Sequence, residues 1–254
     1  MRNYYRDPIL GNGLIFDLMI KEIGTDFIAV AVNPPLFDRG PNKIQAVSDS
    51  FVAGTYVIET PGVVPILTVD LDGIADCINC GTGAWFDTIA TTNAMTFEIV
   101  ALPDVVGTDM LMAGYVTGTG GQAGYPQMLI EGTGYVEFRP TQDTGETSVV
   151  TGSVAIHGGT PHHIITTFAE SDNIAEILVD GGNTDEASVT IACTNDTLQT
   201  LGAENFWIGC RKNQLTVTEN FLDGHVFWAR MWNRRLSRRE RLLLYERARI
   251  VLGL

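Results

Sequence analysis

The sequence lacks an apolar run long enough to cross a membrane, which takes about eighteen residues. Its start, Met-Arg-Asn-Tyr-Tyr-Arg-Asp-Pro, also lacks the apolar stretch that characterises a secretory signal. We therefore expect a protein that is made without a signal peptide and does not insert into a membrane.

Positive charge is scarce in most of the chain. The net charge is −14, and residues 1–210 carry 6 of the 16 basic side chains against 26 acidic ones. Because such a body repels phosphate, we expect no nucleic-acid partner. Residues 211–254 hold the other 10 basic side chains and 4 acidic ones, a net charge of +6. This basic end is either a solvated helix or a surface that docks onto an acidic partner or a second copy of the chain.

Cysteine is sparse, and its spacing does not favour a metal site. Cys77 and Cys80 form a CxxC pair, but zinc would need two further thiolates or histidines at suitable spacing. In a strand, these two positions point to opposite faces. Cys193 and Cys210 lie in different apolar runs. We expect buried or lightly exposed free thiols and, because there is no signal peptide, no disulfide.

Helical periodicity is also rare, whereas short apolar or alternating runs recur along the whole chain. Examples are Met95–Ala101, His163–Phe168 and His225–Trp232, and clusters of Gly, Pro, Asn and Asp separate such runs. No repeat, linker or change in composition divides the chain. The pattern predicts one all-β domain over residues 1–254, and a sandwich rather than a barrel.

The one convincing helix lies at the C-terminal end, over residues 236–252. Ser237 can serve as N-cap, and Glu240 three residues later completes a capping box. Leu244 and Ala248 share a face that can pack on the sandwich, but the segment carries more apolar surface than one face needs. The helix is therefore either a tail along the domain edge or an oligomer or docking contact. The docking residues would be Arg234, Arg235, Arg238, Arg239, Leu242 and Leu243.

A series of weak motifs resembles the laminin-G-like, concanavalin A-like family of jelly-roll domains. Gly13–Asp17 resembles the opening strand of that family, and Leu67–Gly81, Asn93–Pro103 and His162–Phe168 resemble later strands in the same order. Phe221–Tyr245 resembles the closing strand, turn and helix. The resemblance implies an antiparallel two-sheet jelly-roll β-sandwich with a short C-terminal helix.

The closing segment departs from the family where calcium is concerned. In the family, acidic residues after the closing glycine often help to bind calcium, whereas here Gly224 is followed by His-Val-Phe-Trp. Calcium prefers six to eight oxygen ligands. We therefore expect no cofactor, and if calcium binds, the candidate ligands are Asp38, Asp70 and Asp72.

Catalytic patterns of this fold are absent from the sequence. Glucanases of the family carry paired glutamates on one strand, whereas Glu131 and Glu137 are separated by Gly-Thr-Gly and Glu98 is alone in its run. The histidines have no nucleophile motif nearby, and one of His162 and His163 must face the interior of a strand layer. We predict that the protein is not an enzyme.

Two functions remain open. Stand-alone domains of this type resemble those of tailed phages, which implies a virion protein: a capsid decoration, fibre or adhesin, made in the host cytoplasm. Its partners would be copies of itself, the major capsid protein or another virion protein. The alternative is a lectin-like module that binds a cell-surface polysaccharide, with or without calcium, through Trp85, Tyr115 and Tyr125. We favour the virion role; a glycoside hydrolase is the least favoured.

Overall fold

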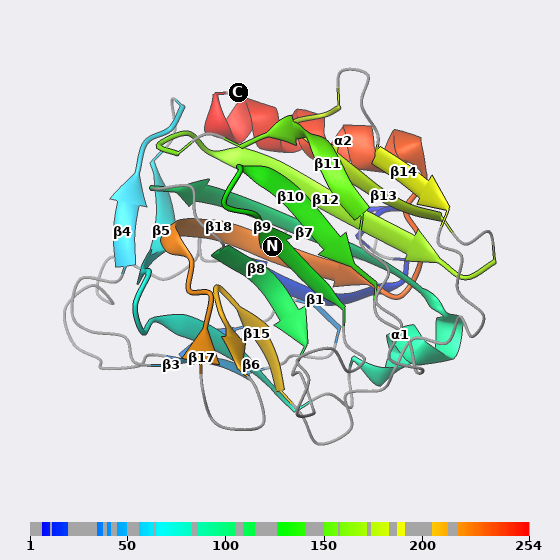
Figure 1. The fold of residues 1–254 in the computed structure, drawn as a ribbon, viewed down its shortest axis with the longest axis horizontal. Coiled ribbons are helices and arrows are strands. Elements are labelled where there is room, and N and C mark those ends of the chain that lie inside the picture. Colours follow the sequence, from blue (N-terminus) through cyan, green and yellow to red (C-terminus); the bar gives the residue numbers. More distant parts are fainter. Residues whose placement is uncertain are drawn as a thin grey trace.

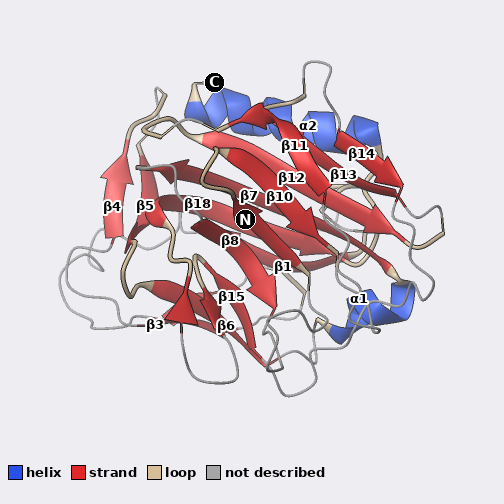
Figure 2. Ribbon diagram, in the orientation of Figure 1, coloured by secondary structure: helices blue, strands red, loops and turns tan. Residues whose placement is uncertain are grey.

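Two antiparallel sheets lie face to face in the computed structural model of the chain (Figure 1), and one long and one short helix lie outside the pair (Figure 2). Among the described residues, no helix has the length and hydropathy that crossing a bilayer requires. The described residues are 7–10, 12–19, 35–37, 40–41, 45–49, 56–62, 65–82, 86–104, 109–114, 126–140, 150–156, 158–171, 174–182, 187–190, 205–212 and 218–253.

One sheet, the helix-side sheet, has the strand order β14-β13-β12-β7-β18-β5-β4, with β1 paired to β18. Its strands are β14 (Ala187–Thr190), β13 (Ile174–Val179), β12 (His162–Ala169), β7 (Ala94–Pro103), β18 (Asp223–Trp232), β5 (Ile66–Asp72), β4 (Tyr56–Glu59) and β1 (Leu14–Met19). The pairing of β1 with β18 joins the two ends of the chain in this sheet.

The opposite sheet has the order β11-β10-β9-β8-β15-β6-β3-β2. Its strands are β11 (Val150–Ala155), β10 (Tyr135–Arg139), β9 (Gln127–Ile130), β8 (Asp109–Gly114), β15 (Asn205–Ile208), β6 (Cys77–Thr82), β3 (Gln45–Asp49) and β2 (Pro35–Phe37). A two-stranded ribbon of β16 (Arg211–Lys212) and β17 (Thr218–Glu219) and the helix α1 (Asp87–Thr92) complete the described elements other than α2.

The main core fills the space between the sheets. Phe97 of the helix-side sheet contacts Phe138 and Phe206 of the opposite sheet edge-on, at ring-centroid distances of 6.2 and 5.7 Å. Alternate residues of each strand point away from this core, as the pleat requires. The predicted antiparallel two-sheet sandwich with a C-terminal helix is confirmed.

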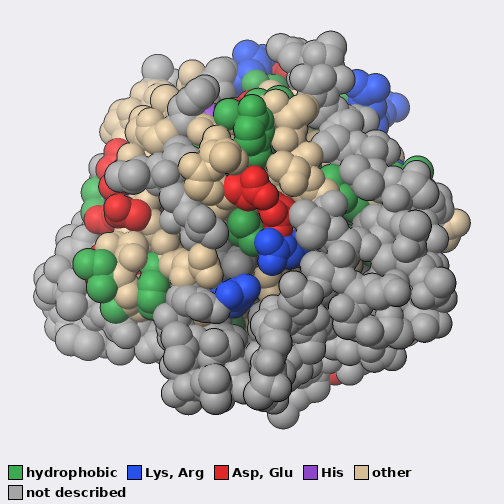
Figure 3. All heavy atoms as spheres, viewed as in Figure 1, with side chains coloured by type: hydrophobic (Ala, Val, Ile, Leu, Met, Phe, Trp, Pro, Cys, Tyr) green, Lys and Arg blue, Asp and Glu red, His purple; other side chains and the backbone are tan. Residues whose placement is uncertain are grey.

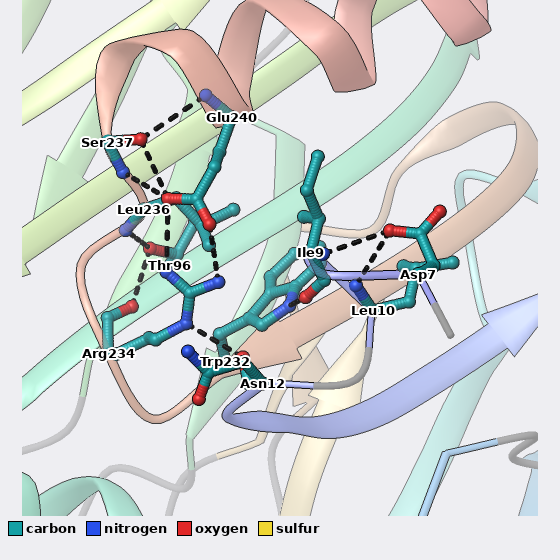
Figure 4. A network of polar contacts seen from close by, with 10 residues as sticks. All are labelled: Asp7, Ile9, Leu10, Asn12, Thr96, Trp232, Arg234, Leu236, Ser237 and Glu240. Carbon is teal, nitrogen blue, oxygen red and sulfur yellow. Dashed lines mark hydrogen bonds and ion pairs between the residues drawn. The ribbon is translucent and has the colours of Figure 1, made fainter. Parts of the chain in front are cut away.

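Helix α2 (Arg238–Leu252) begins two residues later than the sequence predicts, because Ser237 is extended and acts as its N-cap. Ser237 and Glu240 form the predicted capping box (Figure 4). The helix packs on the outer face of the helix-side sheet: Leu244 lies in a buried cluster with Trp232, and Ala248 lies in a second one with Trp228. This packing gives the sheet a second core on its other face.

The cysteines follow the sequence prediction where the structure describes them. Cys77, Cys80 and Cys210 are buried free thiols, and Cys193 lies outside the described residues. Cys80 belongs to the core between the sheets, whereas Cys77 packs in a separate cluster. The two residues of the CxxC pair therefore point to opposite faces.

Candidate functional site

The first two arginines of the predicted docking surface join parts of the chain to each other. Arg234 lies 2.7 Å from Glu240 through Nη2 and donates from Nε to the carbonyl oxygen of Asn12 at 2.7 Å (Figure 4). Arg235 Nη2 lies 2.5 Å from a carboxylate oxygen of Glu176 on β13. These contacts fix the turn between β18 and α2.

The remaining docking candidates lie on α2 itself. Arg238 and Arg239 are exposed on its first turn, Leu243 is 44% exposed, and Leu242 is half-buried. Figure 3 shows basic side chains gathered at the margin of the molecule where α2 lies. Self-association through this end stays a prediction, and it concerns these four residues rather than Arg234 or Arg235.

The double substitution Arg238→Glu with Arg239→Glu reverses two charges on the first turn of α2 and tests that prediction without disturbing the core. Because both side chains are exposed and acidic groups suit a helix N-terminus, we expect the free energy of unfolding to change by less than about 0.5 kcal/mol. If this end mediates self-association, the molar mass measured by light scattering falls to that of one chain. An oligomer that survives the change, or a monomeric parent chain, would contradict docking of one copy onto another here.

The structure describes two of the three predicted calcium ligands, Asp70 and Asp72, and their surroundings differ. Asp38 lies outside the described residues. Asp72 Oδ1 accepts hydrogen bonds from the backbone amides of Ile74, Ala75 and Asp76, at 2.9, 2.8 and 3.0 Å. Burial would raise the pKa of Asp72, but these bonds outweigh it and hold the pKa below its usual value. Asp72 therefore stabilises the turn after β5.

Asp70 instead meets two residues that the sequence did not single out as ligands. His225 is its cross-strand partner on β18, and Asp104 follows β7. Ligand atoms of the three side chains lie within 4.8 Å of one another. Burial raises the pKa of Asp70, and the nearby carboxylates of Asp104 and Asp223 add to this against the opposing effect of His225. The register of β5, β18 and β7, which sequence patterns do not fix, is what brings them together.

Gly224 allows this close approach. Its φ is 141°, and an added Cβ would lie 2.2 Å from the carbonyl oxygen of Leu102 and 2.8 Å from Cα of Pro103. Only glycine lets β18 lie this close to the end of β7. The neighbouring His225 is thereby held beside Asp104.

A second polar group lies on the outer face of the opposite sheet. Glu137 of β10 accepts a hydrogen bond from Arg139 Nε, and its carboxyl group also hydrogen-bonds to Glu131, which follows β9. Burial and the hydrogen bond with Glu131 raise the pKa of Glu137, and Arg139 opposes this rise. The hydrogen bond between the two glutamates lowers the pKa of Glu131. The sequence correctly separates the two glutamates along the chain, but the hairpin between β9 and β10 brings them into contact.

Polar and aromatic side chains surround this pair. Tyr135 is 36% exposed on the same strand, and Thr151 and Ser153 are exposed on the neighbouring β11. Figure 3 shows acidic and basic side chains side by side at the centre of this face, over β10. Tyr135 and Arg139 were missed in the sequence because they look like ordinary outward residues of a strand.

The glycan-binding candidates from the sequence, Trp85, Tyr115 and Tyr125, lie outside the described residues. They stay predictions. The described polar face formed by Glu131, Tyr135, Glu137, Arg139, Thr151 and Ser153 is hereafter called the β10 face.

Comparisons with solved structures find the same fold in carbohydrate-binding domains. The CBM40 of the Ruminococcus gnavus IT-sialidase, solved with α2,3-sialyllactose, is 15% identical with a TM-score of 0.55, and the match covers 70% of this chain and 98% of that domain. The binding domain of botulinum neurotoxin DC with SialylT is 9% identical with a TM-score of 0.61. The binding domain of the same toxin, solved with rat synaptotagmin II, is 8% identical to this chain, also with a TM-score of 0.61. Each toxin match covers 92% of this chain and 51% of the toxin domain.

Such low identities establish a shared fold and nothing finer. A comparison with curated proteins finds no match. A family model, described as the concanavalin A-like lectin/glucanases superfamily, matches residues 82–240, which is more than half of the sequence. The chain belongs to the concanavalin A-like lectin/glucanases superfamily.

Proposed function

We propose that this chain is a carbohydrate-binding module that binds sugars on the β10 face. The observation that carries the proposal is the exposed Tyr135 ring beside the hydrogen-bonded group of Glu131, Glu137 and Arg139. Sugar sites combine an apolar surface with a few well-placed polar groups. The fold shared with a sialidase CBM40 and a toxin binding domain supports this alternative over the virion role.

The polar groups of the β10 face suit sugar hydroxyls. Arg139 donates hydrogen bonds, Glu131 accepts them, and the hydroxyls of Thr151 and Ser153 do both. Contact with Glu137 holds the Arg139 guanidinium in place, so less side-chain entropy is lost when a ligand binds. The face therefore offers both donors and acceptors beside an aromatic ring.

The charges of the β10 face favour a neutral sugar over an acidic one. The one guanidinium described here is already paired with a carboxylate, and Glu131 adds a second acidic group. The net charge of the chain, −14, also repels anionic ligands at long range. The proposed ligand class is therefore a neutral oligosaccharide, unlike the sialylated ligands named for the two structural neighbours.

The glutamate pair itself favours binding over hydrolysis. Retaining glycosidases place their two carboxyl groups about 5–5.5 Å apart and inverting ones further. Glu131 and Glu137 instead share a hydrogen bond, which leaves no room for a sugar carbon or a water molecule between them. We therefore keep the prediction of a non-enzymatic protein. The virion role and the capsid partner also stay predictions, since neither the fold nor the comparisons bear on them.

Replacing Tyr135 by alanine tests the proposal. We expect the Kd for a neutral oligosaccharide found by glycan-array screening to rise about tenfold or more, because the exposed ring loses its stacking contact. Isothermal titration with the hit and with sialyllactose gives the affinities. Tyr135→Phe keeps the ring and is expected to bind nearly as well as the parent.

The second variant, Arg139→Ala, removes a donor and is expected to weaken the same binding. Leu243→Ala, on the far-off helix α2, serves as the matched surface control and leaves affinity unchanged. Equal affinity of the parent and Tyr135→Ala would sink the assignment to the β10 face, and a parent chain that binds sialyllactose but no neutral glycan would sink the ligand class.

A further inference from the structure

His225 lies among carboxylates at the rim of the helix-side sheet. Its Nε2 atom is 3.9 Å from Glu59 Oε1, 3.9 Å from Asp70 Oδ1 and 4.0 Å from Asp104 Oδ1. Figure 3 shows acidic side chains along the margin of the molecule where β4 and β5 lie. These separations are too long for hydrogen bonds, which join heavy atoms at about 2.7–3.2 Å. The nitrogen therefore faces three oxygens across a gap.

A buried threonine determines which nitrogen of the imidazole carries the proton. Thr68 is fully buried, and its hydroxyl donates to the carbonyl oxygen of Val57 at 3.1 Å. A hydroxyl has one proton, so when Thr68 donates to Val57 its Oγ1 can meet His225 Nδ1, 3.3 Å away, only as an acceptor. In the neutral ring, Nδ1 then carries the hydrogen and Nε2 presents its lone pair to the carboxylates.

This arrangement matches the way in which proteins prepare a histidine for a metal ion. Metal-binding histidines use one nitrogen as ligand and donate from the other to an oxygen that fixes the ring. The imidazole of His225 is only 12% exposed, whereas the carboxylates of Asp70 and Asp104 are 40% and 48% exposed. Thr68 thus fixes the imidazole ring on its buried side, whereas the carboxylate groups of Asp70 and Asp104 can rotate at the surface.

The distances suit a small ion with short bonds. Zinc binds nitrogen at about 2.0–2.1 Å and carboxylate oxygen at about 2.0–2.2 Å, so the ligand atoms of a tetrahedral site lie about 3.4 Å apart. The separations here are 3.9 and 4.0 Å from His225 Nε2 and up to 4.8 Å within the group, so both carboxylates would have to move inward by about half an ångström or more. Asp70 is held in register with His225, and Asp104 is held by the bond from its amide to the carbonyl oxygen of Asp223 at 2.9 Å.

We propose that His225, Asp70 and Asp104 bind a divalent transition-metal ion such as zinc. One imidazole with carboxylates favours zinc over calcium, which takes six to eight oxygens. The ion would join β5, β18 and the end of β7 at one rim. Its ligands differ from the predicted calcium set, which shares with it only Asp70.

The test uses the purified full chain, stripped with chelator and titrated with zinc chloride alone. We expect one ion per chain by isothermal titration, and a rise in Tm of about 5 °C or more at a hundredfold excess over Kd. A parallel titration with calcium chloride is expected to leave Tm unchanged.

Three variants locate the ion. Asp104→Asn changes a half-exposed ligand and His225→Gln removes the nitrogen ligand, so both are expected to lose the zinc-dependent rise in Tm. Asp223→Asn removes one charge at the same rim and leaves the ligands in place, so it should keep the rise. If Asp104→Asn responds to zinc like the parent, if the parent does not respond, or if calcium alone raises Tm, the proposed site is wrong.

Discussion

Replacing Glu98 by alanine is expected to lower the free energy of unfolding by about 3–5 kcal/mol. The carboxylate is fully buried between the sheet and helix α2, and it accepts hydrogen bonds from Arg230 Nη1 at 3.1 Å and Trp228 Nε1 at 3.2 Å. His163 Nε2 lies 2.9 Å away. Alanine would remove one carboxylate from the Arg230 guanidinium, which also pairs with Asp17 in a largely buried position.

The same residue is expected to make stability depend on pH in the acid range. Burial would raise the pKa of Glu98, but the charge of Arg230 and the contact with His163 outweigh it and lower the pKa from 4.5 to about 2. Because the folded-state pKa is the lower one, the stabilisation is fully present above about pH 4.5 and is lost as pH falls through about 2.

Urea unfolding at pH 7, 5 and 3 measures both effects. Glu98→Gln is the matched control, since it keeps the size and an acceptor oxygen but not the charge. It should lose less stability than alanine at pH 7, and its unfolding free energy should fall less than that of the parent between pH 5 and 3. A Glu98→Ala chain within about 1 kcal/mol of the parent at pH 7 would show that the buried ion pair contributes little.

The parts of this protein that sequence predicted correctly are those set by local patterns. Alternation of apolar and polar residues identified most strands, and the spacing of Ser237 and Glu240 identified the start of α2. Glycine, proline and asparagine clusters marked the turns between strands. Each of these signals extends over a few neighbouring residues, and local backbone geometry is enough to explain it.

The parts that sequence did not predict depend on which strands are neighbours. Glu98 looks solitary in its run, yet its partners come from β12 and β18. His225 reads as a departure from the family, yet the pairing of β5 with β18 places it opposite Asp70. Such contacts follow from strand order and register, which are fixed by the packing of the whole sandwich. The candidate sites therefore became visible only with the fold.

Replacing Trp232 by alanine is expected to destabilise the protein by about 3–5 kcal/mol. The indole is fully buried under α2 in a cluster with Leu236 and Leu244, and its Nε1 donates to the carbonyl oxygen of Ile9 at 3.0 Å (Figure 4). Alanine would leave a cavity where the N-terminal segment, β18 and α2 meet. Urea unfolding gives the loss in stability, and hydrogen exchange of the α2 amides shows whether the helix loosens first.

Trp232→Phe separates the packing of the indole ring from its hydrogen bond to Ile9. It keeps most of the apolar ring but leaves the Ile9 carbonyl without its donor, so we expect a smaller loss of about 1–3 kcal/mol. A loss below about 1 kcal/mol in Trp232→Ala, with α2 exchanging as in the parent, would mean that the helix does not depend on this anchor. If the expected loss is found, deleting residues 236–254 would uncover both Trp232 and the buried Glu98. Such a deletion would unfold the chain. Substitutions of the exposed Arg238 and Arg239 are then the suitable test of self-association through α2.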